Sequence, residues 1–178
     1  MNRRASYKVA LSGMVAALSL TAMFLTKPLA MLDYTMPAFA GILLVILVID
    51  VSKRWALLTY AGVGFLSVLI ALPQSAVLFI VFFGYYPIVK ALFEQLKPRA
   101  LQWLVKLVLL NAAALVIYKI STHMLFGEDL FEELESFGKY AGLMVLGLCN
   151  VLFVVYDYAL TQLITLYVRT LRPKIFRG

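Results

Sequence analysis

Residues that hold metals or form disulfides are scarce in this chain. It has one cysteine, Cys149, and one histidine, His123. A single cysteine excludes an intrachain disulfide, and no HExxH or CxxC pattern supplies the histidine with partner ligands. The chain also lacks a GxSxG motif, a histidine beside a nucleophile and a glycine-rich phosphate loop. We therefore expect no metal, no other cofactor and no catalytic residues, and we predict that the chain is not an enzyme.

Charge is also scarce, and the charged residues separate apolar segments. They make up 14% of the 178 residues and hydrophobic residues 63%, whereas soluble proteins average about 25% charged and roughly 45–50% apolar residues. A soluble domain of this length cannot bury so much apolar surface, so bilayer lipid must cover it. The net charge of +7 is not gathered in one patch, which argues against nucleic-acid binding. The sequence predicts one membrane domain over residues 1–178, in a bacterial cell membrane.

Six apolar runs, each bounded by charge, proline or glycine, approach the about 20 residues that a spanning helix needs. They predict an all-α polytopic membrane bundle with six transmembrane helices. The expected helices cover residues 9–26, 35–51, 55–72, 75–96, 101–120 and 140–168.

The distribution of lysine and arginine predicts the orientation, because both are enriched in cytoplasmic loops. If both termini are cytoplasmic, only Lys27, Lys119 and Lys139 of the 16 basic residues lie outside. The long connection of residues 121–139 is then external. Its acidic residues accompany apolar ones at helical spacing, so we expect either a short amphipathic helix along the outer surface or a solvated connector.

Ionisable side chains at membrane depth are costly and are usually functional. Lys90 and Glu94 are four residues apart, which predicts an ion pair near the cytoplasmic boundary. Lys106 and Asp157 are expected at comparable depths. They would either pair and hold two helices in register, or take part in transport.

The stretch FFGYYP, residues 82–87, interrupts the fourth apolar run. Because proline removes a backbone donor, it predicts a kink that exposes carbonyl groups, used either to line a cavity or only for packing. An acid and an aromatic residue in the first outer connection would suit a small cationic or ring-bearing ligand. Our candidate substrate-binding residues are Asp33, Tyr34, Tyr85, Tyr86, Asn111 and Asn150.

Small residues four apart on the first helix predict close approach of another helix. The pairs are Ser12 with Ala16 and Gly13 with Ala17. The neighbouring helix belongs either to the same chain or to a partner protein.

The opening of the chain, Asn2-Arg3-Arg4 followed by KVALSGMVAALSL at residues 8–20, resembles that of the S components of energy-coupling factor (ECF) transporters. The resemblance covers the first helix in sequence and the rest of the chain only in layout, and the FGYYP stretch matches no ligand motif of that family. It implies six helices with both termini inside, and a micronutrient bound from the outside. It also implies a transmembrane coupling subunit that contacts Gly13, Ala16 and Ala17, and separate ATPase subunits.

Two functions follow as hypotheses. In the first, the chain is the substrate-binding subunit of a vitamin-like importer and depends on coupling and ATPase subunits. In the second, it is a structural or assembly protein of the bacterial inner membrane that acts through helix–helix contacts. Convergence of the candidate residues on one enclosed volume would favour the first, and their dispersal would favour the second.

Overall fold

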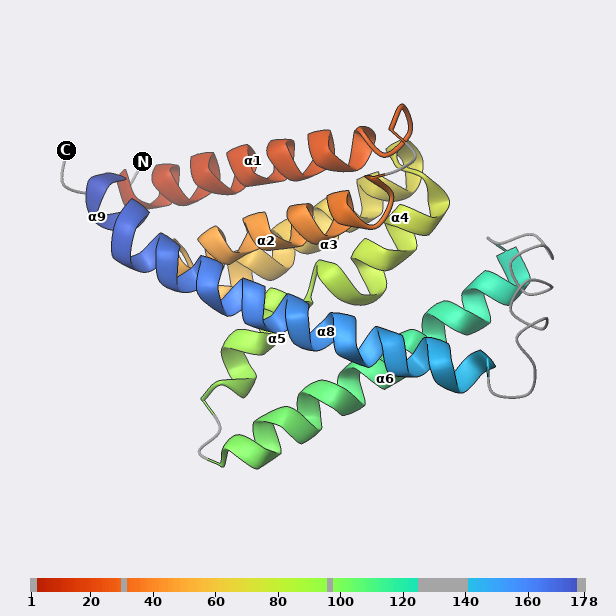
Figure 1. The fold of residues 1–178 in the computed structure, drawn as a ribbon. Helices are drawn as coiled ribbons and strands as arrows, with labels where there is room; N and C mark the ends of the chain where they lie inside the picture. Colours follow the sequence, from red (N-terminus) through yellow and green to blue (C-terminus); the bar gives the residue numbers. More distant parts are fainter. Residues whose placement is uncertain (1–2, 30–31, 96–97, 125–140, 176–178) are drawn as a thin grey trace. The chain divides into compact units, whose positions relative to one another are not determined.

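The computed structural model describes residues 3–29, 32–95, 98–124 and 141–175, and helices are the only regular elements in these ranges (Figure 1). The chain divides into two compact units, residues 1–127 and 128–178. The predicted all-helical class is confirmed for the residues described.

The described residues of the first unit form the following helices. These are α1 (Arg3–Phe24), α2 (Thr35–Asp50), α3 (Lys53–Ile70), α4 (Pro73–Leu78), the π-helix η2 (Phe79–Phe83), α5 (Tyr86–Phe93) and α6 (Arg99–Met124). The second unit contains α8 (Ala141–Leu166), the π-helix η3 (Tyr167–Leu171) and α9 (Arg172–Ile175).

Helix α1 lies against both α2 and α3, and these three helices form the regular part of the first unit (Figure 1). The buried cluster that they share with α4, η2 and α5 is mostly small and aliphatic. The buried cluster consists of Val15, Ala22, Met23, Ala40, Leu44, Leu47, Ala56, Val63, Ala71, Ala76, Phe79 and Ile88. Helix α2 also packs on η2 and α5, so it is the central helix of the unit.

In the part of the chain that the structure describes, five helical segments are long and apolar enough to cross a membrane. They are Ala5–Phe24, Lys53–Ile70, Pro73–Phe93, Ala100–Ile117 and Leu146–Thr170. The sixth expected span is α2, which has 16 residues and is therefore about 24 Å long at 1.5 Å per residue. A hydrocarbon core is about 30 Å thick, so α2 alone falls short of it.

Several helix boundaries differ from the sequence expectation, and α1 already begins at Arg3, six residues before the expected start. The predicted external connection begins at residue 121, but α6 continues as helix to Met124, because residues 121–124 carry no helix-breaking glycine or proline. The amphipathic helix expected in that connection falls on residues 125–139, which lie outside the described residues. In the second unit, the last expected helix changes from α to π geometry at Tyr167, which the sequence analysis did not anticipate.

Candidate functional site

The fourth apolar run is broken in the way that its proline and glycine predict. Between α4 and α5 the chain forms η2, and Gly84 N donates to Phe79 O at 2.7 Å in place of its α-helical acceptor, Ile80 O. The Ile80 carbonyl instead accepts the Tyr60 hydroxyl of α3 at 2.7 Å. A side chain from another helix therefore satisfies a carbonyl that the break releases, as a carbonyl in lipid requires.

The break brings the backbone of the fourth run against α2. Pro87 has no N–H, so it cannot donate to the Phe83 carbonyl four residues earlier. That carbonyl lies directly on α2 at Gly41, where an added Cβ would overlap Phe83 O and lie 2.9 Å from Phe83 C. Gly84 is also tightly packed, but against side chains, because its Cβ would lie 2.6 Å from the Tyr60 ring. Glycine at position 41 lets α2 approach the backbone of the fourth run, and glycine at position 84 lets that run approach the Tyr60 ring of α3.

Aromatic side chains surround the break and use it for packing. Tyr85 meets the Tyr60 ring edge-on, with centroids 6.3 Å apart, and Tyr86 stacks on Phe82 at 5.3 Å. Tyr86 is completely buried. Of the two uses expected for the kink, this geometry fits packing, because both candidate tyrosines contact other aromatic rings.

A set of hydrogen-bonded polar residues links the connection before α2 to the start of α4. Asp33 is buried, its Oδ2 accepts Gln74 Nε2 at 2.9 Å, and its main-chain oxygen accepts the Ser75 hydroxyl at 3.1 Å. Nearby, Thr26 Oγ1 accepts Leu72 N at 3.2 Å. Sequence reasoning named only Asp33, and the sole signal for Leu72, Gln74 and Ser75 was their place beside Pro73. Asp33 thus ties two connections together.

The remaining candidate residues are described each by its own surroundings. Tyr34 is 59% exposed. The Asn111 amide donates to Leu107 O of its own helix at 2.8 Å, and the Asn150 amide of the second unit likewise donates to Leu146 O at 2.7 Å. In each case the side-chain amide donates a hydrogen bond to the backbone carbonyl four residues earlier in its own helix.

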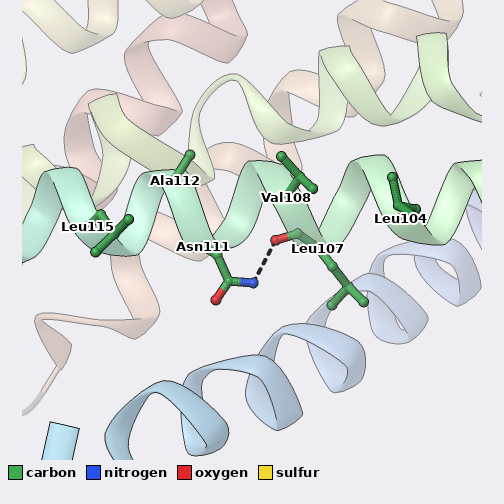
Figure 2. A pocket seen from close by; sticks show the side chains of 6 residues that line it. All are labelled: Leu104, Leu107, Val108, Asn111, Ala112 and Leu115. Atoms are coloured by element: carbon green, nitrogen blue, oxygen red, sulfur yellow. Dashed lines mark hydrogen bonds between the residues drawn. The ribbon is translucent and has the colours of Figure 1, made fainter. Parts of the chain in front are cut away.

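Asn111 lies in a pocket on α6 (Figure 2). Its lining residues are Leu104, Leu107, Val108, Asn111, Ala112 and Leu115. One helix supplies all six, and Asn111 is the only one with a polar side chain. Small-molecule sites normally combine several convergent polar groups, so this surface lacks the character of a ligand cavity.

Basic side chains meet at the other end of the first unit. The predicted pair is confirmed: Lys90 Nζ lies 3.2 Å from Glu94 Oε1, and the Lys90 side chain is 1% exposed. Lys106 Nζ lies 4.0 Å from the same carboxylate oxygen and 5.4 Å from the Trp103 ring centroid. Lys53 Nζ donates to Ala91 O at 3.2 Å. Glu94 thus connects lysines of α5 and α6.

The expected pair of Lys106 and Asp157 stays a prediction, because the two residues belong to different units. Asp157 lies in α8, where its main-chain oxygen accepts the Thr161 hydroxyl at 2.8 Å.

The small residues of α1 fall on two faces. Ser12 is buried, and Ala16 packs partly buried against the core, so this pair serves contacts within the chain. Gly13 and Ala17 are exposed, and nothing lies within 4 Å of a Cβ placed on Gly13. The outward face therefore presents small residues without a neighbour in the first unit.

Within the first unit, the structure does not bring the candidate substrate-binding residues to one volume. In the described part of the chain, no group of three histidine, cysteine or acidic side chains is placed to hold a metal ion. Comparison with protein-family models, with curated proteins and with solved structures finds no match.

Proposed function

We propose that this chain is a non-catalytic membrane subunit that acts by docking the outward face of α1 onto transmembrane helices of a partner protein. The observation that carries the proposal is the division of α1 into two faces. Its inner face is used by α2 and α3, while Gly13 and Ala17 face outward, four residues apart. Such small pairs let two helix backbones approach closely, and the van der Waals packing that follows is one of the forces that associate helices in lipid.

In this proposal the chain crosses the membrane six times with both termini in the cytoplasm. The sixth crossing is α2, whose short length is offset because α1, α3, η2 and α5 pack around it. The basic end of the first unit supports this orientation. Lys53, Lys90 and Lys106 gather there, on the side that the lysine and arginine bias makes cytoplasmic.

Crosslinking at single positions tests the docking face. A photoreactive amino acid at Met14 or Leu18, both exposed on α1, should yield a discrete protein adduct in membranes. The Gly13→Leu variant should abolish that adduct, since the larger side chain keeps the partner backbone away. The control is Gly62→Leu on α3, which also has nothing within 4 Å of its Cβ and should leave the adduct unchanged. Equal loss in both variants would refute the proposal.

A second candidate function is substrate binding for a micronutrient importer, with α1 docking on a coupling subunit that works with ATPase subunits. Buried Asp33 at the end of the unit opposite the lysines favours it, since it supplies a carboxylate for a cationic ligand. Thermal unfolding against a panel of vitamins tests this, because a ligand at a hundred times its Kd stabilises by about 2.7 kcal/mol. The identity of the crosslinked partner separates an importer from an assembly complex.

A further inference from the structure

Lys53, at the start of α3, is a half-buried cation that is held in place without an acidic partner. Its Nζ donates to the Ala91 carbonyl near the end of α5 at 3.2 Å. Among the residues that the structure describes, neither Lys53 nor the adjacent Arg54 forms an ion pair with an acid. A lysine ammonium has three donors, and the Ala91 carbonyl takes only one of them. Lys53 is therefore fixed in position and still able to bind an acceptor.

A second donor meets Lys53 on the same carbonyl. Gln95 Nε2 also donates to Ala91 O, at 3.0 Å, and the Gln95 side chain is exposed. A side-chain amide has two donors, so Gln95 likewise keeps one for another acceptor. Arg54 is exposed as well. The start of α3 and the end of α5 thus present two cations and an amide donor, which we call the α3–α5 basic surface: Lys53, Arg54 and Gln95.

The acidic residues near this surface leave it positive. Glu94 Oε1 lies 3.2 Å from Lys90 Nζ and 4.0 Å from Lys106 Nζ, so its charge is compensated by other lysines. Asp50 is half-buried at the end of α2, and it forms no ion pair with the cations of the α3–α5 basic surface. Even with the Asp50 charge counted against them, these two cations leave a positive excess. The surface suits an anion.

Exposed apolar side chains continue from the cations along α3. Leu57 and Leu58 follow Lys53 and Arg54 by four residues, so each lies on the same face of the helix as the cation before it. Both leucines are exposed, and Phe65 extends the apolar surface two turns further. A ligand that lies along this face therefore meets positive charge at one end and apolar surface along the rest.

The two tryptophans of the chain lie at the same end of the first unit. Trp55 is in the first turn of α3, and Trp103, in α6, lies under Lys106, whose Nζ is 5.4 Å from the ring centroid. Lys106 in turn lies beside Glu94 of the α5 end. Tryptophan is enriched at the level of the lipid headgroups, so these residues indicate that the α3–α5 basic surface lies at that level.

We propose that the α3–α5 basic surface binds the phosphate headgroup of an anionic phospholipid whose acyl chains lie along Leu57 and Leu58. Lysine binds phosphate as a point charge, and arginine binds it through paired N–H donors. Basic pockets between transmembrane helices are known sites for anionic lipid headgroups. Because a phospholipid joins phosphate to acyl chains, it matches both parts of the surface, whereas free phosphate matches only the first. The inference does not depend on the docking role of α1.

Thermal unfolding of the purified full chain in detergent tests the proposal. Phosphatidylglycerol should raise the unfolding temperature saturably, and phosphatidylcholine with the same acyl chains should give a smaller rise, because its headgroup has no net charge. Inorganic phosphate without lipid should give no rise. Equal rises with the two lipids would overturn recognition of charge. A rise with inorganic phosphate as large as that with phosphatidylglycerol would overturn the lipid and assign the surface to a soluble phosphate.

Variants then assign the effect to the cations. Lys53→Gln and Arg54→Gln each remove one positive charge and keep a polar side chain. Each should raise the half-saturating concentration of phosphatidylglycerol roughly fivefold, which is the contribution of one basic residue near an anionic membrane surface. The matched control is Lys27→Gln, which removes the same charge from an exposed residue in the turn beside the end of α3, not its start. An equal increase in the control would show that net charge, and not this surface, is responsible.

Arg54→Gln keeps the test decisive if Lys53→Gln does not fold. Arg54 is exposed, and in the described part of the chain its side chain makes no hydrogen bond or ion pair that the substitution would break. An unchanged half-saturating concentration in Arg54→Gln would contradict the proposal. Lys53→Arg keeps the charge and should bind phosphatidylglycerol as the wild type does. A loss in Lys53→Arg as large as that in Lys53→Gln would mean that the bond to Ala91, and not the charge, carries the effect.

Discussion

Two parts of the first unit meet the demands of the bilayer in different ways. In α1, α2 and α3 the backbone hydrogen bonds close within each helix, and small and aliphatic side chains fill the contacts. In the run from α4 through η2 to α5, a carbonyl leaves the helix pattern and is satisfied by Tyr60 of α3. Every backbone polar group in lipid needs a partner. The regular part finds it locally, whereas the broken part depends on individual residues elsewhere in the chain.

Gly41 is the position where this dependence is expected to be strongest. Replacing it by alanine places a Cβ against the Phe83 carbonyl, and backbone on both sides prevents an easy shift. Overpacking typically costs 1–3 kcal/mol, and here we expect about 3 kcal/mol or more. The measurement is thermal unfolding of the purified variant in detergent.

Gly62→Ala is the matched control for Gly41→Ala in the regular part. Both glycines lie inside helices, but nothing lies within 4 Å of a Cβ on Gly62. The substitution should stabilise by roughly 0.5–1 kcal/mol, since alanine loses less backbone entropy than glycine in a helix. If the two variants changed stability alike, the close approach of α2 to the broken run would be wrong.

Tyr60→Phe tests the hydrogen bond that serves the break. It removes the hydroxyl that donates to Ile80 O but keeps the ring that contacts Phe79 and Tyr85. Leaving a buried acceptor without a partner costs about 1–3 kcal/mol, and interhelical hydrogen bonds in membranes reach about 1.7 kcal/mol. We expect a loss of about 1–2 kcal/mol in thermal or denaturant unfolding.

The same substitution at Tyr34 provides the comparison. Tyr34 is 59% exposed and lies outside the break, so Tyr34→Phe should change stability by less than about 0.5 kcal/mol. A neutral effect of Tyr60→Phe as well would mean that the Ile80 carbonyl does not rely on the Tyr60 hydroxyl.

Features that depend on a short stretch of chain were predictable from the sequence. Apolar runs bounded by charge or proline gave the positions of the long helices, and the i,i+4 spacing of Lys90 and Glu94 gave their ion pair. The proline and glycine near residues 84–87 gave the break, which begins earlier than expected, at Phe79. Each of these rests on the local chemistry of the backbone or on helix periodicity.

Features that join distant segments were not predictable in the same way. Tyr60 and Ile80, Gly41 and Phe83, and Asp33 and Gln74 meet only when separate helices pack. Their partners carry no periodic signal, because a tyrosine or glutamine at a helix surface is equally compatible with solvent, lipid headgroups or a distant carbonyl. The candidate tyrosines were therefore placed at a ligand site by their chemistry alone.

Ser19→Ala should have a small effect, and it tests an interhelical hydrogen bond in the regular part of the first unit. Ser19 Oγ donates to Ala40 O at 3.3 Å, so this bond also joins two helices through a hydroxyl and a carbonyl. The difference lies in the acceptor: Ala40 O is inside regular helix and already accepts within α2, whereas Ile80 O has lost its α-helical donor. Interhelical hydrogen bonds in membranes average about 0.6 kcal/mol, and the better helix propensity of alanine offsets part of that loss. Unfolding of Ser19→Ala should therefore lie within about 0.5 kcal/mol of wild type. A loss of stability as large as that of Tyr60→Phe would show that the interhelical hydroxyl bond contributes equally in both parts. The larger effect expected for Tyr60→Phe would then not come from the released Ile80 carbonyl.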